Sequence, residues 1–180
     1  MQLKKQLVQK LQQFDLIKQG QFTLKSGKTS SIYIDLRPIV SLPSLLREVA
    51  DALWKLIESE PPELICGVPY SGLPIASCLT VLHDLPMLLF RKQRKDYGTQ
   101  QQIEGIFQAG QTCVLIEDVI TTASSVLDVI THLETAGLLV RKILVFVDRE
   151  QGGKERLLQS GYQVDAVFTL TQLRSLLSAS

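Results

Sequence analysis

Long apolar runs are absent from this sequence, and so is a surplus of charge of one sign. No stretch approaches the roughly 18 uninterrupted apolar residues that a membrane-spanning helix needs. The 180 residues carry a formal net charge of +1, with 45% hydrophobic and 21% charged residues, values typical of globular proteins. We therefore expect neither a membrane protein nor one that binds nucleic acid through a broad basic surface.

Cysteine and histidine are also scarce. The cysteines Cys66, Cys78 and Cys113 are odd in number, far apart and set in apolar surroundings, which favours reduced core residues over disulfides or a metal site. His83 and His132 fall in expected helices with no partner at ligand spacing, so a structural or surface role is expected. The opening segment "MQLKKQLVQKLQQF" lacks the apolar region and cleavage site of a secretory signal, so we expect a cytoplasmic protein.

Helical and strand-like patterns alternate along the chain. Apolar residues recur at helical spacing over 3–18, 43–59, 72–83, 124–137, 154–160 and 171–178. Between them lie short apolar runs at 64–68, 87–90, 113–118, 143–148 and 165–170, most of them continuous rather than alternating. Such runs are typical of strands buried on both faces, so we predict an α/β fold with a mostly parallel central sheet flanked by helices.

Two segments stand apart from this alternation. The strand-like pieces "QFTLKSG" (21–27) and "SIYIDLR" (31–37) precede the core and are expected to form a small N-terminal hood. The polar segment "RKQRKDYGTQQQIEG" (91–105) shows neither the helical nor the strand spacing of apolar residues and is expected to be a long loop. Long loops in compact domains are often lids or binding loops.

The stretch "VLIEDVITTASS" (114–125) places two adjacent acids at the end of an apolar run. Ligands of open parallel sheets bind outside the carboxyl ends of the strands, where Glu117 and Asp118 would lie. The hydroxyl-rich segment 121–125 then leads into a helix, whose unpaired N–H groups and positive end favour phosphate. Because carboxylates can accept hydrogen bonds from sugar hydroxyls, the combination indicates a ribose phosphate.

A purely structural interpretation accounts for the same residues. Asp118 would cap a turn, Glu117 would be solvated, and Ser124 or Thr122 would cap the next helix. The local spacing does not decide between these interpretations, so other segments must.

The same run resembles the phosphoribosyl-pyrophosphate motif of type I phosphoribosyltransferases, with a departure at Ala123, where Gly is usual. Four further segments resemble, in order and spacing, those of orotate phosphoribosyltransferases, especially the form fused into animal UMP synthases. They are "FTLKSGKTSSIYIDLR" (22–37), "CGVPYSGLP" (66–74), "RKQRKDYG" (91–98) and "VDREQGG" (147–153). The resemblance implies the type I phosphoribosyltransferase fold in a single domain over 1–180, with about residues 1–40 contributing the hood.

For the donor, phosphoribosyl pyrophosphate, the resemblance implies catalytic roles for Lys92, Lys95 and Asp118. Cations suit this chemistry because negative charge grows on the leaving pyrophosphate as C1′ becomes oxocarbenium-like. Lys95 is expected to reach the active site of a neighbouring subunit, whereas Arg94 matches no contact. Ser71 stands where many bacterial members have Lys, and Tyr97 where they often have His. The implied donor-binding residues are Lys25, Tyr70, Ser71, Arg91, Lys92, Lys95, Tyr97, Glu117, Asp118, Val119, Ile120, Thr121, Thr122, Ala123, Ser124 and Ser125.

The implied acceptor, orotate, is a planar carboxylate anion, which a planar guanidinium can hold by paired hydrogen bonds. Arg149 directly follows the apolar run 143–148 and so is expected at the same sheet edge as the two acids. Taken alone, it would instead be interpreted as a surface salt bridge with Asp148 or Glu150. The resemblance also implies that two hood residues cover the base. The implied orotate-binding residues are Tyr33, Ile34, Thr121 and Arg149.

The implied activity is transfer of a 5-phosphoribosyl group to N1 of orotate, giving orotidine 5′-monophosphate and pyrophosphate in UMP biosynthesis. The implied cofactor is Mg²⁺, held mainly through substrate and water without a direct protein ligand, and the implied assembly is a homodimer with shared active sites. Two alternatives share the donor motif: transfer to another base, and a regulatory module that senses phosphoribosyl pyrophosphate without turning it over. Arg149 and the hood argue against the first, and the lysine-rich loop argues against the second.

Overall fold

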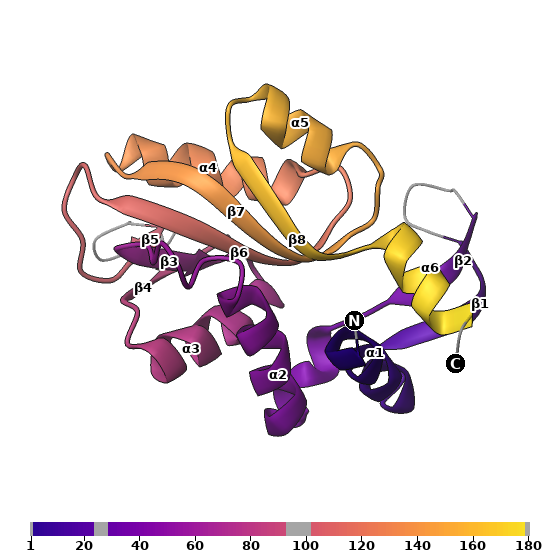
Figure 1. Cartoon of the computed structure of the whole chain (residues 1–180). Coiled ribbons are helices and arrows are strands. Elements are labelled where there is room, and N and C mark those ends of the chain that lie inside the picture. The colour runs from indigo at the N-terminus through magenta and orange to yellow at the C-terminus, as the bar shows by residue number, and fades with distance from the viewer. Residues whose placement is uncertain (1, 24–28, 93–101, 179–180) are drawn as a thin grey trace.

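The computed structural model describes residues 2–23, 29–92 and 102–178. Its main feature is a six-stranded sheet in the order β5-β4-β3-β6-β7-β8, parallel except for the short edge strand β5, which is antiparallel to β4 (Figure 1). The predicted mostly parallel sheet is thus confirmed. Its strands are β3 (Leu64–Gly67), β4 (Met87–Phe90), β5 (Ile103–Glu104), β6 (Thr112–Ile120), β7 (Leu139–Asp148) and β8 (Gln163–Thr169).

Helices cover both faces of this sheet, as the continuous apolar strands require. Residues of β3 and β6 are buried on both sides because successive side chains point alternately into two separate hydrophobic clusters. One cluster lies under α2 and α3, and the other under α4 and α5 (Figure 1). The bounds of these helices are α2 (Pro43–Trp54), α3 (Gly72–His83), α4 (Ser124–Thr135) and α5 (Gly153–Gln159).

The N-terminal segment forms a smaller, two-stranded antiparallel sheet beside the main one, at the place predicted for the hood. The C-terminal helix α6 packs next to it (Figure 1). These elements are α1 (Gln2–Gln13), β1 (Ile17–Thr23), β2 (Thr29–Ile34), the 3₁₀ helix η1 (Arg37–Ser41) and α6 (Leu170–Ser178).

The first predicted helix, 3–18, is too long. The helix ends at Gln13, and Asp15 adopts a left-handed conformation with φ of 59° that turns the chain into β1. Leu16 and Ile17 continue the apolar pattern because they remain buried in the same core, although their backbone has left the helix. Burial of both segments in one core therefore made the apolar period run past the true end of the helix.

The predicted loop 91–105 is anchored at its far end. Ile103 pairs with Phe90 and is buried, and the Gln102 carbonyl accepts a hydrogen bond of 2.8 Å from the Arg91 N–H. Two strand residues are too few to produce a visible alternation, so the sequence pattern missed β5.

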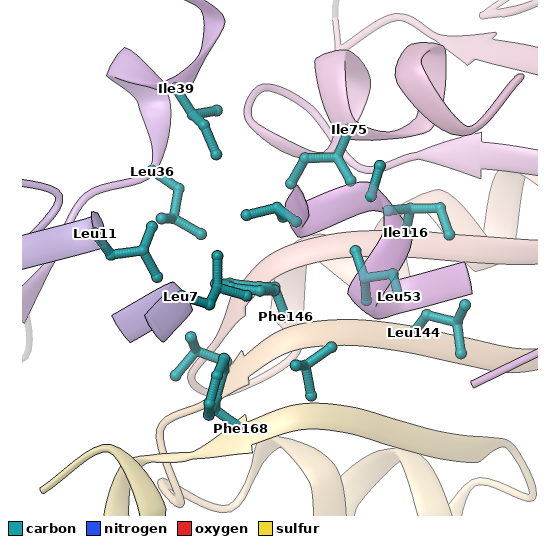
Figure 2. Close-up of a cluster of buried hydrophobic side chains, with 14 of the residues drawn as sticks. Leu7, Leu11, Leu36, Ile39, Leu53, Ile75, Ile116, Leu144, Phe146 and Phe168 are labelled. Atoms are coloured by element: carbon teal, nitrogen blue, oxygen red, sulfur yellow. The ribbon is translucent and has the colours of Figure 1, made fainter. Parts of the chain in front are cut away.

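The hood is fixed to the main sheet by a shared hydrophobic core (Figure 2). Leu7 and Leu11 of α1 lie in one cluster with Phe146 of β7 and Phe168 of β8, whose rings meet edge to face at 5.5 Å. Burying each of these leucines contributes about 1.5–3 kcal/mol, so this contact holds the hood at a defined place beside the strand ends.

The remaining predictions about scarce residues agree with this core. Cys66 and Cys113 are buried free thiols and Cys78 is half-buried, and burial raises the pKa of Cys66 to about 12. His83 lies in α3 and stacks on Trp54 at 4.1 Å. Among the described residues, no helix is both long and apolar enough to cross a membrane.

Candidate functional site

The two predicted acids lie near the end of β6, which continues past them to Ile120, and they have different surroundings. Glu117 is buried, and its Oε1 accepts a hydrogen bond of 3.1 Å from the Asp118 backbone N–H. Burial, and then the neighbouring charge of Asp118, raise the pKa of Glu117 well above its usual value. Asp118 is only half-buried. The interpretation of Glu117 as a solvated surface acid is therefore wrong.

The hydroxyl-rich loop after β6 forms a small hollow of about 60 Å³, lined by Glu117 and by residues 119–126. Its key backbone position is Ala123, which is the N-cap of α4 and lies in the left-handed region with φ of 62°. No side chain of the described residues caps α4, so the interpretation of Ser124 or Thr122 as a mere helix cap is wrong. The two hydroxyls instead lie 3.2 Å apart. The uncapped first-turn N–H groups make this hollow suited to an anion.

A second loop, residues 68–72, lies against the same end of β6. Its start is tied to the strand by the Val68 N–H, which donates to the Ile116 carbonyl at 2.8 Å. Its end approaches so closely that a Cβ on Gly72 would lie 2.4 Å from that carbonyl oxygen, so only glycine fits there. Ser71 is buried, whereas Tyr70 is 70% exposed and follows a cis Pro69–Tyr70 peptide bond.

The two described cations of the basic loop lie in different settings. The Nζ of Lys92 is 4.6 Å from the ring centroid of Tyr70, and its charge acts to lower the pKa of Glu117. Arg91 forms an ion pair of 2.9 Å with Glu104 of β5. The cavity between the two loops has a volume of about 300 Å³. It is lined by Val68, Pro69, Phe90, Lys92, Ser124, Ser125, Asp128 and Val129.

Arg149 comes from the neighbouring strand end and points under the hood. It is buried, and its Nη2 donates to Ser30 Oγ at 3.0 Å and to the Ile32 carbonyl at 3.3 Å, across a separation of 119 residues in the first case. Its Nε is buried without a partner among the described residues. Burial, and then the charge of Arg174, lower the pKa of Arg149.

The acids beside Arg149 are bonded elsewhere. Asp148 Oδ1 accepts the Glu150 N–H at 2.8 Å, and Glu150 Oε2 accepts both the N–H and the hydroxyl of Thr171. Within the described part of the chain, no salt bridge joins Arg149 to either acid, so the surface salt-bridge interpretation is wrong.

Ser30 is the site residue that sequence reasoning missed. Its side chain is buried, and its Oγ also donates to the Ile32 carbonyl at 2.8 Å. The signal was present in the alternation of Ser30, Ile32 and Ile34, which all face inward along β2. A serine at an inward position of a strand needs a polar partner, and Arg149 is that partner.

The other predicted hood residues lie on the two sides of β2. Tyr33 is half-buried, with its ring 5.4 Å from that of Phe22. The side chain of Ile34 belongs to the hydrophobic core, so it faces away from Tyr33. Thr121 is exposed at the start of the phosphate-loop segment. Lys25, Lys95 and Tyr97 lie outside the described residues.

The oxygen ligands at this edge fit a cation that is shared with a substrate. Among the described residues, no group of three or more His, Cys, Asp or Glu side chains could enclose a metal ion. Asp118 presents a half-buried carboxylate, a hard oxygen donor that can bond to metal-bound water. The donor set therefore fits Mg²⁺ only if most of its coordination comes from ligand and water oxygens.

Comparison with known proteins places these features in a family. A family model described as the phosphoribosyl transferase domain matches residues 38–161. The chain is 40% identical over 180 residues to orotate phosphoribosyltransferase of Chlamydia felis, covering 98% of this chain and 87% of that protein. It is 43% identical over 173 residues to uridine 5′-monophosphate synthase of Bos taurus, covering 95% of this chain but only 36% of that longer protein.

Solved structures give the same result. The crystal structure of orotate phosphoribosyltransferase from Aeropyrum pernix superimposes with a TM-score of 0.85 and 32% identity, covering 97% of this chain and 99% of that one. The structure of UMP synthase from Leishmania donovani superimposes with a TM-score of 0.87 and 36% identity, covering 97% of this chain and 38% of that longer one. The fold is therefore the type I phosphoribosyltransferase fold, and the chain belongs to the orotate phosphoribosyltransferase family.

Proposed function

We propose that this chain transfers the 5-phosphoribosyl group of phosphoribosyl pyrophosphate to N1 of orotate, with inversion at C1′ and release of pyrophosphate. The observation that carries the proposal is the joining of an anion hollow and a buried guanidinium at one sheet edge. The backbone N–H of Arg149 donates to the Ile120 carbonyl at 3.0 Å. This bond fixes Arg149, the residue proposed to bind orotate, to the strand that carries the phosphate loop.

The 5′-phosphate of the donor sits in the hollow formed by the loop 121–125, where backbone N–H groups and hydroxyls converge. The Asp118 carboxylate accepts hydrogen bonds from the ribose hydroxyls. Buried Glu117 holds Asp118 in place, because its Oε1 accepts the Asp118 N–H. This division of roles follows from burial, since the carboxylate of Asp118 is half-buried, whereas Glu117 is buried at the edge of the hollow.

The leaving pyrophosphate sits between the loop 68–72 and the basic loop that begins at Arg91. Lys92, held over the exposed ring of Tyr70, supplies positive charge to that space. Arg91 can contribute only by exchanging its ion pair with Glu104 for the pyrophosphate. Lys95, from the partner subunit of a homodimer, supplies a further cation at the leaving group.

When bound, Mg²⁺ neutralises charge on the pyrophosphate and ribose oxygens. Asp118 would bond to it through water, in line with the reluctance of this cation to dehydrate. We also propose that the protein works in the cytoplasm, where both substrates of pyrimidine synthesis would be available. Light scattering of the purified chain tests the homodimer, and the mass of a single 20.1 kDa chain would contradict it.

The acceptor carboxylate binds Arg149. Two hydrogen bonds hold one edge of the guanidinium to Ser30 and Ile32, and the buried Nε–H remains for a ligand. A buried donor without a partner is costly, and a planar carboxylate arriving under the hood satisfies it. Adenine and hypoxanthine carry no carboxylate, so they leave that donor unpaired.

One assay tests the acceptor. The purified chain is mixed with phosphoribosyl pyrophosphate and Mg²⁺, and with orotate, adenine, hypoxanthine or uracil in parallel. We expect release of pyrophosphate with orotate alone. Turnover of another base without orotate turnover would overturn the acceptor assignment, and donor binding without any turnover would favour a regulatory module.

A further inference from the structure

Helix α5 packs directly against the outside of the phosphate loop. At its first residue, Gly153, a Cβ would lie 2.4 Å from the Thr121 carbonyl oxygen and 3.0 Å from the Ala123 nitrogen. Any side chain at Gly153 would push the loop away from the helix. The backbone of the loop is therefore in direct contact with the start of α5, which does not itself line the hollow.

One turn further along α5, Arg156 reaches the same loop with its side chain. Its Nη1 donates to the Thr122 carbonyl at 3.2 Å and lies 3.5 Å from Ser124 Oγ. Ser124 Oγ is in turn 3.2 Å from Thr122 Oγ1. In the described part of the chain Arg156 forms no salt bridge, so its charge is not neutralised there by a carboxylate.

The loop needs such support because of Ala123. A residue other than glycine at φ of 62° is strained, and strained backbone persists only where its surroundings fix it. Gly153 supplies close packing at one end of the loop, and Arg156 supplies a hydrogen bond at the carbonyl just before Ala123. The Arg156 guanidinium also lies beside Ser124, which lines the hollow, so its positive charge favours a phosphate bound there.

We propose that Arg156 is a positioning residue for the donor: it fixes the conformation of the phosphate loop from behind and adds positive charge beside the 5′-phosphate. The proposal rests on the proposed function only for the identity of the anion. It differs from the role of Arg149, which faces the acceptor, and of Lys92, which faces the leaving group.

Binding of ribose 5-phosphate, measured by calorimetry, tests this without any turnover. Arg156→Gln should weaken binding by about three- to tenfold, the scale of one ordinary hydrogen bond, because Arg156 acts on the phosphate through the loop. The matched control is Arg141→Gln. It removes the same charge from an exposed arginine near the start of β7, the end of the strand that lies away from Arg149, and should leave binding unchanged. Equal binding by parent and Arg156→Gln would overturn the proposal. A parent chain that does not bind ribose 5-phosphate at all would overturn the proposed function as well.

Steady-state kinetics separate positioning from a general loss of structure. Arg156→Gln should raise KM for phosphoribosyl pyrophosphate while leaving kcat, KM for orotate and the unfolding temperature unchanged. Arg156→Lys keeps the charge and one donor, so its KM should lie within about threefold of the parent. A Lys variant as impaired as the Gln variant, or a parallel loss of affinity for both substrates, would contradict the assignment.

Discussion

The donor side and the acceptor side of the site are built from the chain in different ways. The donor side comes mainly from one continuous segment, 117–125, which is a strand end, a loop and a helix start. The acceptor side forms when Arg149 of the main sheet meets Ser30 of the hood, 119 residues away. A ligand on the donor side therefore contacts local backbone, whereas a ligand on the acceptor side depends on how the hood packs on the sheet.

This difference predicts different responses to substitution. Changes on the donor side should alter charge or hydrogen bonding at one place and leave the acceptor affinity intact. Changes on the acceptor side should affect KM for orotate, including changes in the hood that do not touch orotate. Under the proposed function the basic loop serves the leaving group, so changes in it should affect turnover most.

Lys95→Ala is expected to have the largest effect, a fall in kcat of about 10²–10³, the scale for removing one stabiliser of the transition state. Steady-state assays with both substrates at saturation measure it. Arg94→Ala is the control, because it removes a cation one position away that matches no family contact, and its kcat should change far less. Normal turnover by Lys95→Ala would remove this loop from the mechanism.

Arg149→Lys should raise KM for orotate by about 10², since loss of a charge-assisted hydrogen bond costs about 1.5–3 kcal/mol. Lysine keeps the charge but lacks the planar, forked arrangement of donors with which a guanidinium can bond Ser30 along one edge and a carboxylate along another. KM for phosphoribosyl pyrophosphate should stay within a factor of about two, because the substitution keeps the backbone N–H that bonds Ile120 and changes only a side chain that faces the hood. An equal rise in both KM values would contradict the division of the site into two sides.

Ser30→Ala should have a smaller effect of the same kind, a rise in KM for orotate of about three- to tenfold, because Arg149 loses one of its two hood contacts. Ser31→Ala is the control, since Ser31 is the next residue of β2 and its side chain is exposed and faces the other way. A Ser30→Ala variant with normal KM for orotate would show that the Ile32 carbonyl alone holds the guanidinium.

How far the sequence could predict this site follows from the same comparison. The local structure of the segment 117–125, a strand end followed by a loop and a helix start, was predictable because its residues are consecutive and the apolar runs located the strand. The contact between Ser30 and Arg149 was not, since no local pattern links residues on separate sheets. The burial of Glu117 was missed for a related reason: local spacing does not show that the end of β6 lies inside the sheet rather than at its surface.

The smallest expected effect concerns stability, at the two ends of β6. Burial raises the pKa of Glu117 in the folded state above its value of about 4.5 in the unfolded chain. Its contribution to the free energy of unfolding is therefore fully present below pH 4.5 and is lost as the pH rises towards the folded pKa. Glu117→Gln removes this loss and keeps an oxygen that can accept the Asp118 N–H. It should therefore unfold a few degrees higher than the parent at neutral pH, and the difference should vanish near pH 4.

Glu63 provides the control of opposite sign. It directly precedes β3, and its carboxylate accepts the N–H and hydroxyl of Thr112, the first residue of β6, at 2.7 and 2.8 Å. Those hydrogen bonds lower the pKa of Glu63, so its contribution is present at neutral pH and is lost as the pH falls through the folded pKa. Glu63→Gln should therefore unfold slightly lower than the parent at neutral pH. Unfolding temperatures measured from pH 4 to pH 8 compare the two variants. If Glu117→Gln is no more stable than the parent at neutral pH, the buried acid imposes no cost on the fold, and the donor side of the site is not strained by its own carboxylate.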